Sequence, residues 1–458
     1  MTPNRSQNAE SQNARPQGAR PDTDLIMVCT PDIAGQLRGK AMPRRAIERR
    51  REIGVGWTPT NVMITAFGPI APSPWGALGD LMLRPDFSSE VDLALPDWGL
   101  DESFVLGDLL TLDGAPWECC LRGQLARALE RLERDHGLRL IASFEHEFHY
   151  SDAEAQPGLG YALRALRRLG AFPNRLMAVL DRAGLELDTF MPEYGPGQCE
   201  VTVAPQPGLR AADEASILRE LTRATARGLG ARASFAPILD PNGVGNGVHV
   251  HFSLQDREGR PLSHDPAAPE GVSKPAAAFL GGIVRRLPEM VALTAPGVPS
   301  YLRLTPNRWS AAFNNLGSQD REASLRICPV FGTGLSAEQH AGRFNFEYRA
   351  ADAAASPHLV LAAIVNAGLE GLDEGLPLPT VTTQNLAELE PDALAALGRE
   401  RLPTSLAAAL DRLEAGTWAT RAFGEVLVEA YRRHKRAEID LMKELSPEEL
   451  CARYALAY

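Results

Sequence analysis

The sequence predicts an α+β protein with two domains, a small and mostly β amino-terminal domain and a large domain whose sheet is covered on one side by helices. Its 458 residues are too many for one compact core. Short strand candidates separated by Pro and Gly run to about residue 110. From residue 117 onward, strand candidates with one polar face alternate with long helical patterns, which is typical of an α+β domain.

The small domain is predicted to span residues 25–114. Residues 1–24 are rich in Asn, Gln, Arg and Pro and have almost no large apolar side chain, so we expect a disordered tail. An apolar strand candidate follows at residues 25–29, then the turn-forming stretch 31–35, and another strand at residues 80–86. This domain is therefore expected to be mostly β.

The large domain is predicted to span residues 115–458. Its first helix has leucines three or four residues apart and ends near Gly137. Further helical patterns cover residues 211–228, 276–287 and 359–372, and no internal repeat is visible. These helices are expected to cover one face of the sheet.

Five strand candidates of this domain carry charged or imidazole side chains on one face and apolar side chains on the other. They are residues 143–149, 198–203, 248–254, 324–327 and 344–349. Because strand side chains alternate, the polar faces align Glu145 with Glu147, His249 with His251 and Ser253, and Asn345 with Glu347 and Arg349. Each pattern alone is more often a solvated edge or a packed pair. Together they predict one site, and oxygen-rich sets with an imidazole suit Mg²⁺ or Mn²⁺.

Other segments add to this predicted site. A Pro/Gly turn joins Glu193 to Glu200, and a glycine-rich run that includes Gly245 leads into the His249 strand, where the backbone passes close to a ligand. Four arginines fall in or beside the same segments: Arg303, Arg321, Arg326 and Arg349. Carboxylates for metal ions beside guanidinium groups for anions are what phosphoryl transfer needs.

Composition narrows the class of protein. Apolar content of 44% and charged content of 23% are ordinary for a globular protein, and the net charge of -11 argues against a nucleic-acid partner. The six cysteines show no zinc spacing and are expected to be small buried side chains in a reducing cytoplasm. No apolar run is long enough to span a bilayer, and no signal core is present, so we expect a cytoplasmic protein without a membrane partner.

The order of these motifs resembles the glutamine synthetase superfamily, and the resemblance covers nearly the whole chain. The matching segments are residues 145–147, 193–200, 245–254, 300–304, 320–327, 347–359 and 402–406. The resemblance implies a β-grasp amino-terminal domain and a catalytic domain with a curved antiparallel sheet backed by helices. It further implies stacked homo-oligomeric rings, expected to be dodecamers, with each active site between neighbouring subunits.

The resemblance also implies roles for individual residues. One divalent ion would be held by Glu147, Glu193 and Glu200, and a second by Glu145, His249 and Glu347. His251 and Ser253 would contact ATP. Arg303, Arg349 and Gly245 would bind the acid substrate, while Arg321 and Arg326 would act at the transferring phosphate. The implied reaction is phosphorylation of the glutamate γ-carboxylate by ATP, followed by attack of an amine.

Two loops depart from the pattern of enzymes that use ammonia. The position expected to carry an ammonium-binding acid is Trp309, and the corresponding amino-terminal loop carries Trp57 and likewise has no acid. Indole surface favours an amine with an apolar body, so we expect a γ-glutamyl-amine ligase, although ordinary packing is the alternative role for each tryptophan. Val244 stands where the family often has Asn, which leaves the acid open.

Three other classes compete with this interpretation. They are a true glutamine synthetase, a non-catalytic structural or sensor homologue, and a phosphotransferase related to phosphagen kinases. All six metal-ligand and all four arginine positions are retained, which argues against a non-catalytic homologue because a scaffold needs none of them. No guanidine-handling motif is visible, which argues against the phosphotransferase.

Overall fold

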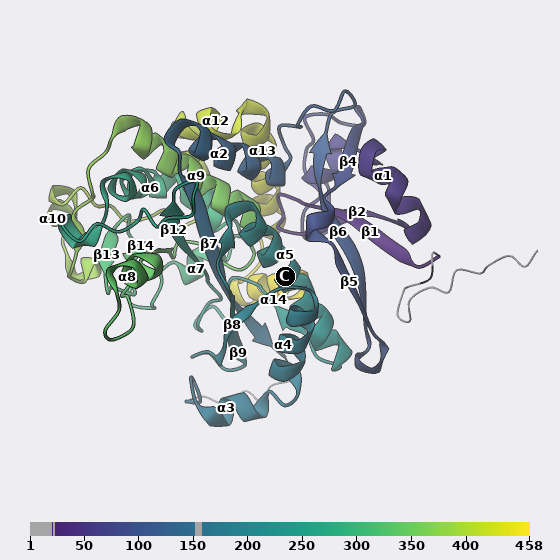
Figure 1. Cartoon of the computed structure of the whole chain (residues 1–458), viewed down its shortest axis with the longest axis horizontal. Coiled ribbons are helices and arrows are strands. Elements are labelled where there is room, and N and C mark those ends of the chain that lie inside the picture. Colours follow the sequence, from purple (N-terminus) through teal and green to yellow (C-terminus); the bar gives the residue numbers. More distant parts are fainter. Residues whose placement is uncertain (1–20, 22, 152–157) are drawn as a thin grey trace, which may run out of the picture.

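The computed structural model of the chain describes residues 21, 23–151 and 158–458. The predicted disordered tail lies almost entirely outside the described residues. The remainder is a mixed α+β structure in which the amino-terminal domain lies to one side of the large domain, as the purple and dark blue ribbons of Figure 1 show. The α+β prediction from the sequence is therefore confirmed.

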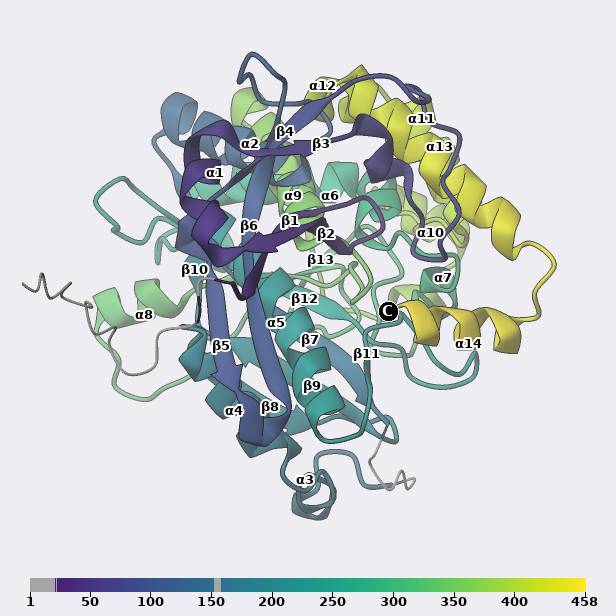
Figure 2. The same cartoon turned by 90° about the vertical axis from the view of Figure 1, so that its right-hand side faces the viewer.

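The amino-terminal domain is a six-stranded sheet with one helix of its own. The strands follow the order β2-β1-β6-β4-β3, and β5 pairs with β6. The parallel pairing of β1 with β6 in the middle of the sheet and the antiparallel hairpins beside it give the predicted β-grasp arrangement, which faces the viewer in Figure 2. Its elements are β1 (Leu25–Pro31), β2 (Leu37–Pro43), α1 (Ile47–Ile53), β3 (Val55–Trp57), β4 (Leu81–Pro85), β5 (Val91–Leu95) and β6 (Leu100–Leu110).

The large domain contains a second sheet, with the order β16-β13-β14-β15-β12-β7-β9-β8. Pairing is antiparallel from β14 to β8, as expected, but β13 pairs in parallel with both β14 and β16, so one edge of the sheet is parallel. The strands are β7 (Arg139–Tyr150), β8 (Leu187–Pro192), β9 (Gln198–Val203), β10 (Gln206–Pro207), β11 (Ala233–Ser234), β12 (Val248–Gln255), β13 (Leu316–Ser318), β14 (Leu325–Ile327), β15 (Phe346–Tyr348) and β16 (Val381–Thr382).

Long helices pack on this sheet and on each other. The predicted helices are present as α2 (Leu121–His136), α5 (Gly208–Gly228), α6 (Lys274–Thr294) and α9 (Pro357–Glu374). Helix α6 continues through Pro288, beyond the predicted end at residue 287, because its apolar residues continue into the core. Gly282 and Gly371 let α6 and α9 approach closely, since a Cβ at either position would overlap the backbone of the other helix.

The remaining helices complete the large domain. They are α3 (Leu163–Arg168), α4 (Phe172–Arg182), α7 (Ser300–Arg303), α8 (Ala337–Arg343), α10 (Pro391–Ala396), α11 (Leu406–Ala415), α12 (Trp418–Phe423), α13 (Glu425–Met442) and α14 (Pro447–Ala457). No helix in the described part of the chain combines the length and apolarity needed to cross a membrane.

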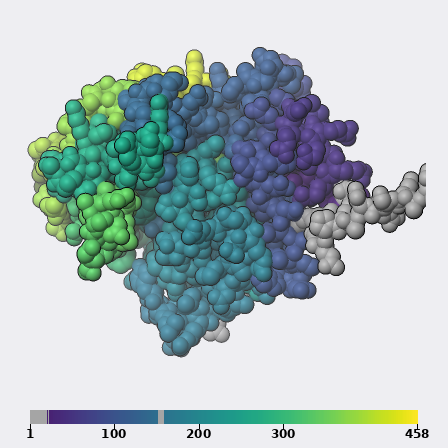
Figure 3. Space-filling model, viewed as in Figure 1, coloured from purple at the N-terminus to yellow at the C-terminus, as the bar shows by residue number. Residues whose placement is uncertain are grey.

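The two domains pack tightly against each other. Their buried apolar residues form one continuous cluster, and Figure 3 shows the two domains in contact along one side of the molecule. Arg122 on α2 crosses the junction: its guanidinium lies 2.5 Å from Asp86 and 3.0 Å from Asp108 of the amino-terminal domain, and 3.0 Å from Asp213 on α5. One nearly buried cation therefore pairs with acids from both domains.

Candidate active site

The polar strand faces predicted from the sequence meet on β7, in the middle of the large sheet. Glu147 on β7 lies opposite Glu200 on β9, and Glu145 lies opposite His249 on β12. Directly paired residues of an antiparallel ladder have neighbouring side chains on the same face. The sheet register therefore brings four of the predicted metal ligands together from three strands.

The row of polar side chains continues across β12 to β15 and β14. His251 on β12 lies opposite Glu347 on β15, and Glu347 lies opposite Arg326 on β14. The Arg326 guanidinium donates to Glu347 Oε2 at 2.9 Å, and Arg349 pairs with Glu347 Oε1. Ser253 is two residues further along the same face of β12, opposite Ile141, and so lies toward the edge of the site.

Two sets of side chains could each hold a metal ion. The first is Glu145, His249 and Glu347, and the second is Glu147, Glu200 and His249; within each set the ligand atoms lie within 4.8 Å of one another. His249 Nδ1 is 3.3 Å from Glu145 Oε2 and 3.6 Å from Glu347 Oε1. Carboxylate oxygens with one imidazole are ligands that Mg²⁺ or Mn²⁺ accept, so the residues present fit such ions.

Glu193 is near these sets but stands apart from them. Its carboxylate accepts hydrogen bonds from Tyr161 Oη at 3.1 Å and from the Tyr194 backbone at 2.9 Å. The second set thus contains His249 where the sequence interpretation expected Glu193. Burial, and after it the charge of Glu147, raises the pKa of Glu193.

The charges at the two ends of the site differ. Burial, together with the charges of Glu145, Glu147, Glu193 and Glu347, raises the pKa of Glu200 to about 9. At the other end burial opposes ionisation of Glu347, but Arg349 and the two site histidines outweigh it and lower its pKa to about 2. Among the described residues no ion pair neutralises Glu147 or Glu200, and a divalent ion would complete such an environment.

Arg303 explains the glycine-rich run before β12. Its guanidinium is buried and donates to the Ala351 carbonyl at 3.0 Å. A Cβ at Gly245 would lie 2.6 Å from Arg303 Cγ, and one at Gly247 would overlap the guanidinium. The close approach predicted for this backbone is therefore to the Arg303 side chain. The fourth arginine, Arg321, is exposed in the loop before β14, whereas the other three are buried.

The two tryptophans have different surroundings. Trp309 is 58% exposed, and its ring lies 6.3 Å from that of Tyr194, which is 62% exposed. Trp57 is only 6% exposed and packs in the core of the amino-terminal domain. The indole surface expected at Trp57 is thus absent, because ordinary packing has buried it.

Glu322 is a neighbour of Trp309 that the sequence interpretation missed. Its carboxylate accepts hydrogen bonds from the backbone N–H of Trp309 at 2.5 Å and of Asn307 at 2.9 Å. Arg349 Nη2 donates to the Trp309 carbonyl at 3.3 Å, so the 306–310 loop is tied to the site from both sides. Although no acid lies within this loop, a carboxylate does reach it from a different segment.

Gln198 is a second residue without a predicted role. Its amide nitrogen lies 3.2 Å from Glu147 Oε2, 2.9 Å from the Gly245 carbonyl and 3.1 Å from Asn246 Oδ1. These bonds join β9 to the glycine-rich run. The polar face of the 198–203 strand was the available signal, because Gln198 shares it with Glu200.

Donor sets for divalent ions beside buried guanidinium groups are the arrangement that phosphoryl transfer needs. Comparison with known proteins gives the family. Residues 118–452 match the model of the glutamine synthetase catalytic domain, and residues 16–117 match that of the glutamine synthetase N-terminal domain. The chain therefore belongs to the glutamine synthetase family and is an ATP-dependent ligase that forms a C–N bond.

Individual relatives agree with this assignment. The chain is 32% identical over 444 residues to gamma-glutamylpolyamine synthetase GlnA3 of Streptomyces coelicolor, covering 94% of this chain and 93% of the relative. It is 28% identical over 429 residues to a glutamine synthetase of Methanocaldococcus jannaschii, covering 89% and 90%. A solved structure described as a novel glutamine synthase homolog superposes with a TM-score of 0.86 at 39% identity, covering 96% of this chain and 100% of that one.

Proposed function

We propose that this protein joins the γ-carboxylate of glutamate to an organic amine, with ATP as the source of energy. A carboxylate oxygen attacks the γ-phosphorus of ATP, and the P–O bond to ADP breaks. The amine nitrogen then attacks the acyl carbon of γ-glutamyl phosphate, inorganic phosphate leaves, and the nitrogen releases a proton. Phosphorylation makes the reaction possible because phosphate is a far better leaving group than oxide.

The side chains have distinct roles in this proposal. Arg303 and Arg349 bind the carboxylates of the acid, and their burial strengthens that interaction. Arg326 lies next to Glu347, from where it can reach the transferring phosphate, and Arg321 must swing in from solvent to join it. His251 and Ser253 follow one another on the same face of β12, where they contact the nucleotide.

Divalent ions fit the two carboxylate sets, with Glu193 as an additional ligand of the Glu147 and Glu200 set. Mg²⁺ or Mn²⁺ held there would neutralise the phosphate oxygens as charge develops on them. The raised pKa of Glu200 supports this assignment, since crowded carboxylates without a cation resist ionisation.

The observation that carries the choice of an organic amine is the exposed aromatic pair formed by Tyr194 and Trp309. It lies directly beside Glu193, so an amine that approaches this carboxylate meets two ring faces. Ring faces attract ammonium groups that carry apolar carbon. They bind a small, strongly hydrated ammonium ion more weakly. The name of the Streptomyces relative, a gamma-glutamylpolyamine synthetase, supports an amine of this kind.

A second candidate is a glutamine synthetase that uses ammonia, and Glu322 is the observation in its favour. This carboxylate reaches the 306–310 loop and could attract ammonium there. ADP release should be measured with glutamate and ammonia, methylamine, ethanolamine, polyamines or aromatic amines. We expect an organic amine to give the highest kcat/KM; ammonia performing equally well or better would overturn the proposal.

A substitution at Trp309 sharpens this test. Trp309→Phe keeps a ring face and is expected to retain the preference for the organic amine. Trp309→Glu removes the ring and adds a carboxylate, so the kcat/KM for organic amines should fall by about tenfold or more, as expected for loss of a contact worth over 1 kcal/mol. Ammonia should be affected less.

We also propose that the chain forms homo-oligomeric rings, with dodecamers as the specific expectation and the active site between neighbouring subunits. The family resemblance supports this. Light scattering coupled to gel filtration would give the mass; a monomer that is fully active would contradict the proposal.

A further inference from the structure

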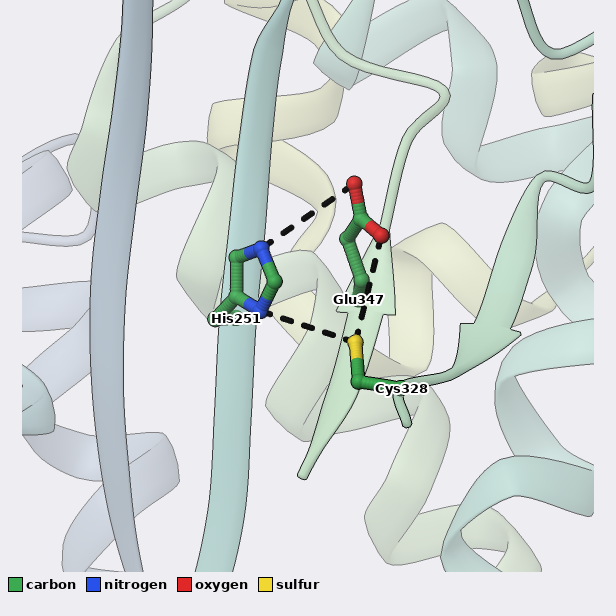
Figure 4. Close-up of side chains that lie close together, drawn as sticks. All are labelled: His251, Cys328 and Glu347. Atoms are coloured by element: carbon green, nitrogen blue, oxygen red, sulfur yellow. Dashed lines mark hydrogen bonds and ion pairs between the residues drawn. The ribbon is translucent and has the colours of Figure 1, made fainter. Parts of the chain in front are cut away.

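Cys328 lies within reach of two predicted active-site residues. It follows β14 directly, is 7% exposed, and its Sγ is 3.7 Å from His251 Nδ1 and 3.9 Å from Glu347 Oε2. Figure 4 shows the three side chains turned toward one another from β12, β15 and the end of β14. One ligand atom from each lies within 4.8 Å of the other two.

The two separations from Cys328 Sγ are close to the edges of a tetrahedral zinc site. With Zn–S of about 2.3 Å and Zn–N or Zn–O of about 2.0 Å, two ligands at the tetrahedral angle are about 3.5 Å apart. The two sulfur distances exceed this value by only a few tenths of an ångström, so small side-chain rotations would close the set.

The orientation of His251 also fits a metal ligand. Its Nε2 lies 3.2 Å from Glu145 Oε1 without a formed hydrogen bond, and a small rotation would give the carboxylate contact that orients a histidine whose other nitrogen binds a metal. Nδ1 lies 2.9 Å from Asn345 Oδ1. A metal ion at Nδ1 would replace the proton shared there, and the amide oxygen would be the nearest fourth ligand.

We propose that Cys328, His251 and Glu347 form a site for a thiophilic divalent cation, with Zn²⁺ as the probe of choice. A thiolate selects zinc over magnesium, whereas the two neighbouring carboxylate sets favour harder ions. One thiolate, one carboxylate and a neutral imidazole balance the charge of Zn²⁺, and binding releases the thiol proton and the Nδ1 proton to solvent.

Zinc at this position would inhibit the enzyme. It would take Glu347 from the Glu145 and His249 set and His251 from the nucleotide, so it would compete with the ions and the ATP that the reaction needs. This consequence rests on the proposed function, whereas the binding of zinc itself does not. The site would thus make the activity sensitive to thiophilic metals.

The test uses the full-length protein after treatment with a chelator. Co²⁺ serves as a spectroscopic substitute for Zn²⁺, because a thiolate ligand gives it a near-ultraviolet charge-transfer band, and calorimetry gives the affinity for Zn²⁺. We expect the band in the wild type and in Cys451→Ala, a control at another buried cysteine on α14, and its loss in Cys328→Ala. Zinc affinity should fall at least about tenfold in Cys328→Ala. Mutating a residue that only hydrogen-bonds to a metal ligand already lowers metal affinity by about that much.

Inhibition provides a separate readout. The Zn²⁺ concentration that halves ADP release should be about tenfold or more higher for Cys328→Ala than for Cys451→Ala. An unchanged band or zinc affinity in Cys328→Ala would overturn the proposal, and a wild type without the band would do so even if that variant failed to fold. Absence of turnover with every amine would instead count against the proposed function.

Discussion

Replacing Gly245 by alanine should separate binding of the acid substrate from binding of ATP. The new Cβ would lie 2.6 Å from Arg303 Cγ, 2.8 Å from Arg303 Cδ and 2.7 Å from the Pro237 carbonyl oxygen. Non-bonded heavy atoms prefer about 3.5–4.0 Å, so the overlap is about 1 Å. The Pro237 backbone cannot yield, because Ile238 and Gly245 form a β-bridge. The Arg303 stem must therefore move, and its guanidinium must move with it.

The size of the effect follows from the contact that is lost. A hydrogen bond to a charged group contributes about 1.5–3 kcal/mol, so displacing Arg303 should lower kcat/KM for the acid about 10- to 150-fold. Overpacking should also lower the free energy of unfolding by about 1–3 kcal/mol. The assay is steady-state ADP release with the acid varied at saturating ATP and amine, together with calorimetric titration of a non-hydrolysable ATP analogue.

Gly342→Ala is the matched control. Gly342 is on α8, its backbone φ suits any residue, and a Cβ there would have no neighbour within 4 Å. This variant should behave as the wild type does. If Gly245→Ala keeps its KM for the acid, or loses ATP binding to the same extent as acid binding, then the proposal that Arg303 binds the acid is refuted.

Three further predictions concern metal binding, the domain junction and pH. Mn²⁺ at one hundred times its dissociation constant should stabilise the wild type by about 2.7 kcal/mol, seen as a higher thermal midpoint, and Glu147→Gln should lose most of this gain. Arg122→Met removes the cation shared by three acids, of which Asp213 keeps only His358, and should lower the free energy of unfolding by about 3–5 kcal/mol, measured by denaturant titration. Burial lowers the pKa of His434 well below its ordinary value, so the unfolded chain takes up a proton first as the pH falls below about 6.5. The contribution of His434 to the free energy of unfolding should be fully present above that pH. Below it, the free energy of unfolding should decrease by up to about 1.4 kcal/mol per pH unit, and less steeply in His434→Gln.

Each of these predictions has a clear contrary outcome. An equal Mn²⁺ gain in Glu147→Gln would place the ion elsewhere. Wild-type stability in Arg122→Met would show that Asp86, Asp108 and Asp213 do not depend on their common cation. The same slope with pH in His434→Gln and the wild type would assign the acid sensitivity to other groups.

The strands of the site were predictable because one face of each is polar. The 198–203 prediction coincides with β9, and β7 and β12 contain the predicted stretches. Because side chains alternate along a strand, the sequence alone shows which residues of each strand lie on the same face. Register could not be predicted: that His251 lies opposite Glu347, and Glu147 opposite Glu200, depends on pairing between distant segments.

Residues that act through loops or through the core were harder to predict. Trp57 stands on a short strand whose neighbours bury it, and the sequence shows only that it is large and aromatic. Cys328 could not be distinguished from the other five buried cysteines, since its proximity to His251 arises from the β14–β15–β12 pairing. In both cases tertiary packing decided what the residue contacts.

Whether the enzyme uses ammonia or an organic amine depends on whether the Glu322 carboxylate is free to bind an ammonium ion. Both of its oxygens accept backbone N–H groups of the 306–310 loop, and burial raises the pKa of this carboxyl although the two hydrogen bonds oppose that shift. An ammonium ion would have to share oxygens that already hold this loop in place. The ring faces of Tyr194 and Trp309, in contrast, are exposed and have no such competitor in the described part of the chain. We infer that Glu322 positions the loop and that the aromatic pair selects the amine. Glu322→Gln should then raise the KM for every amine to a similar degree, whereas Trp309→Ala should penalise amines with longer apolar chains the most.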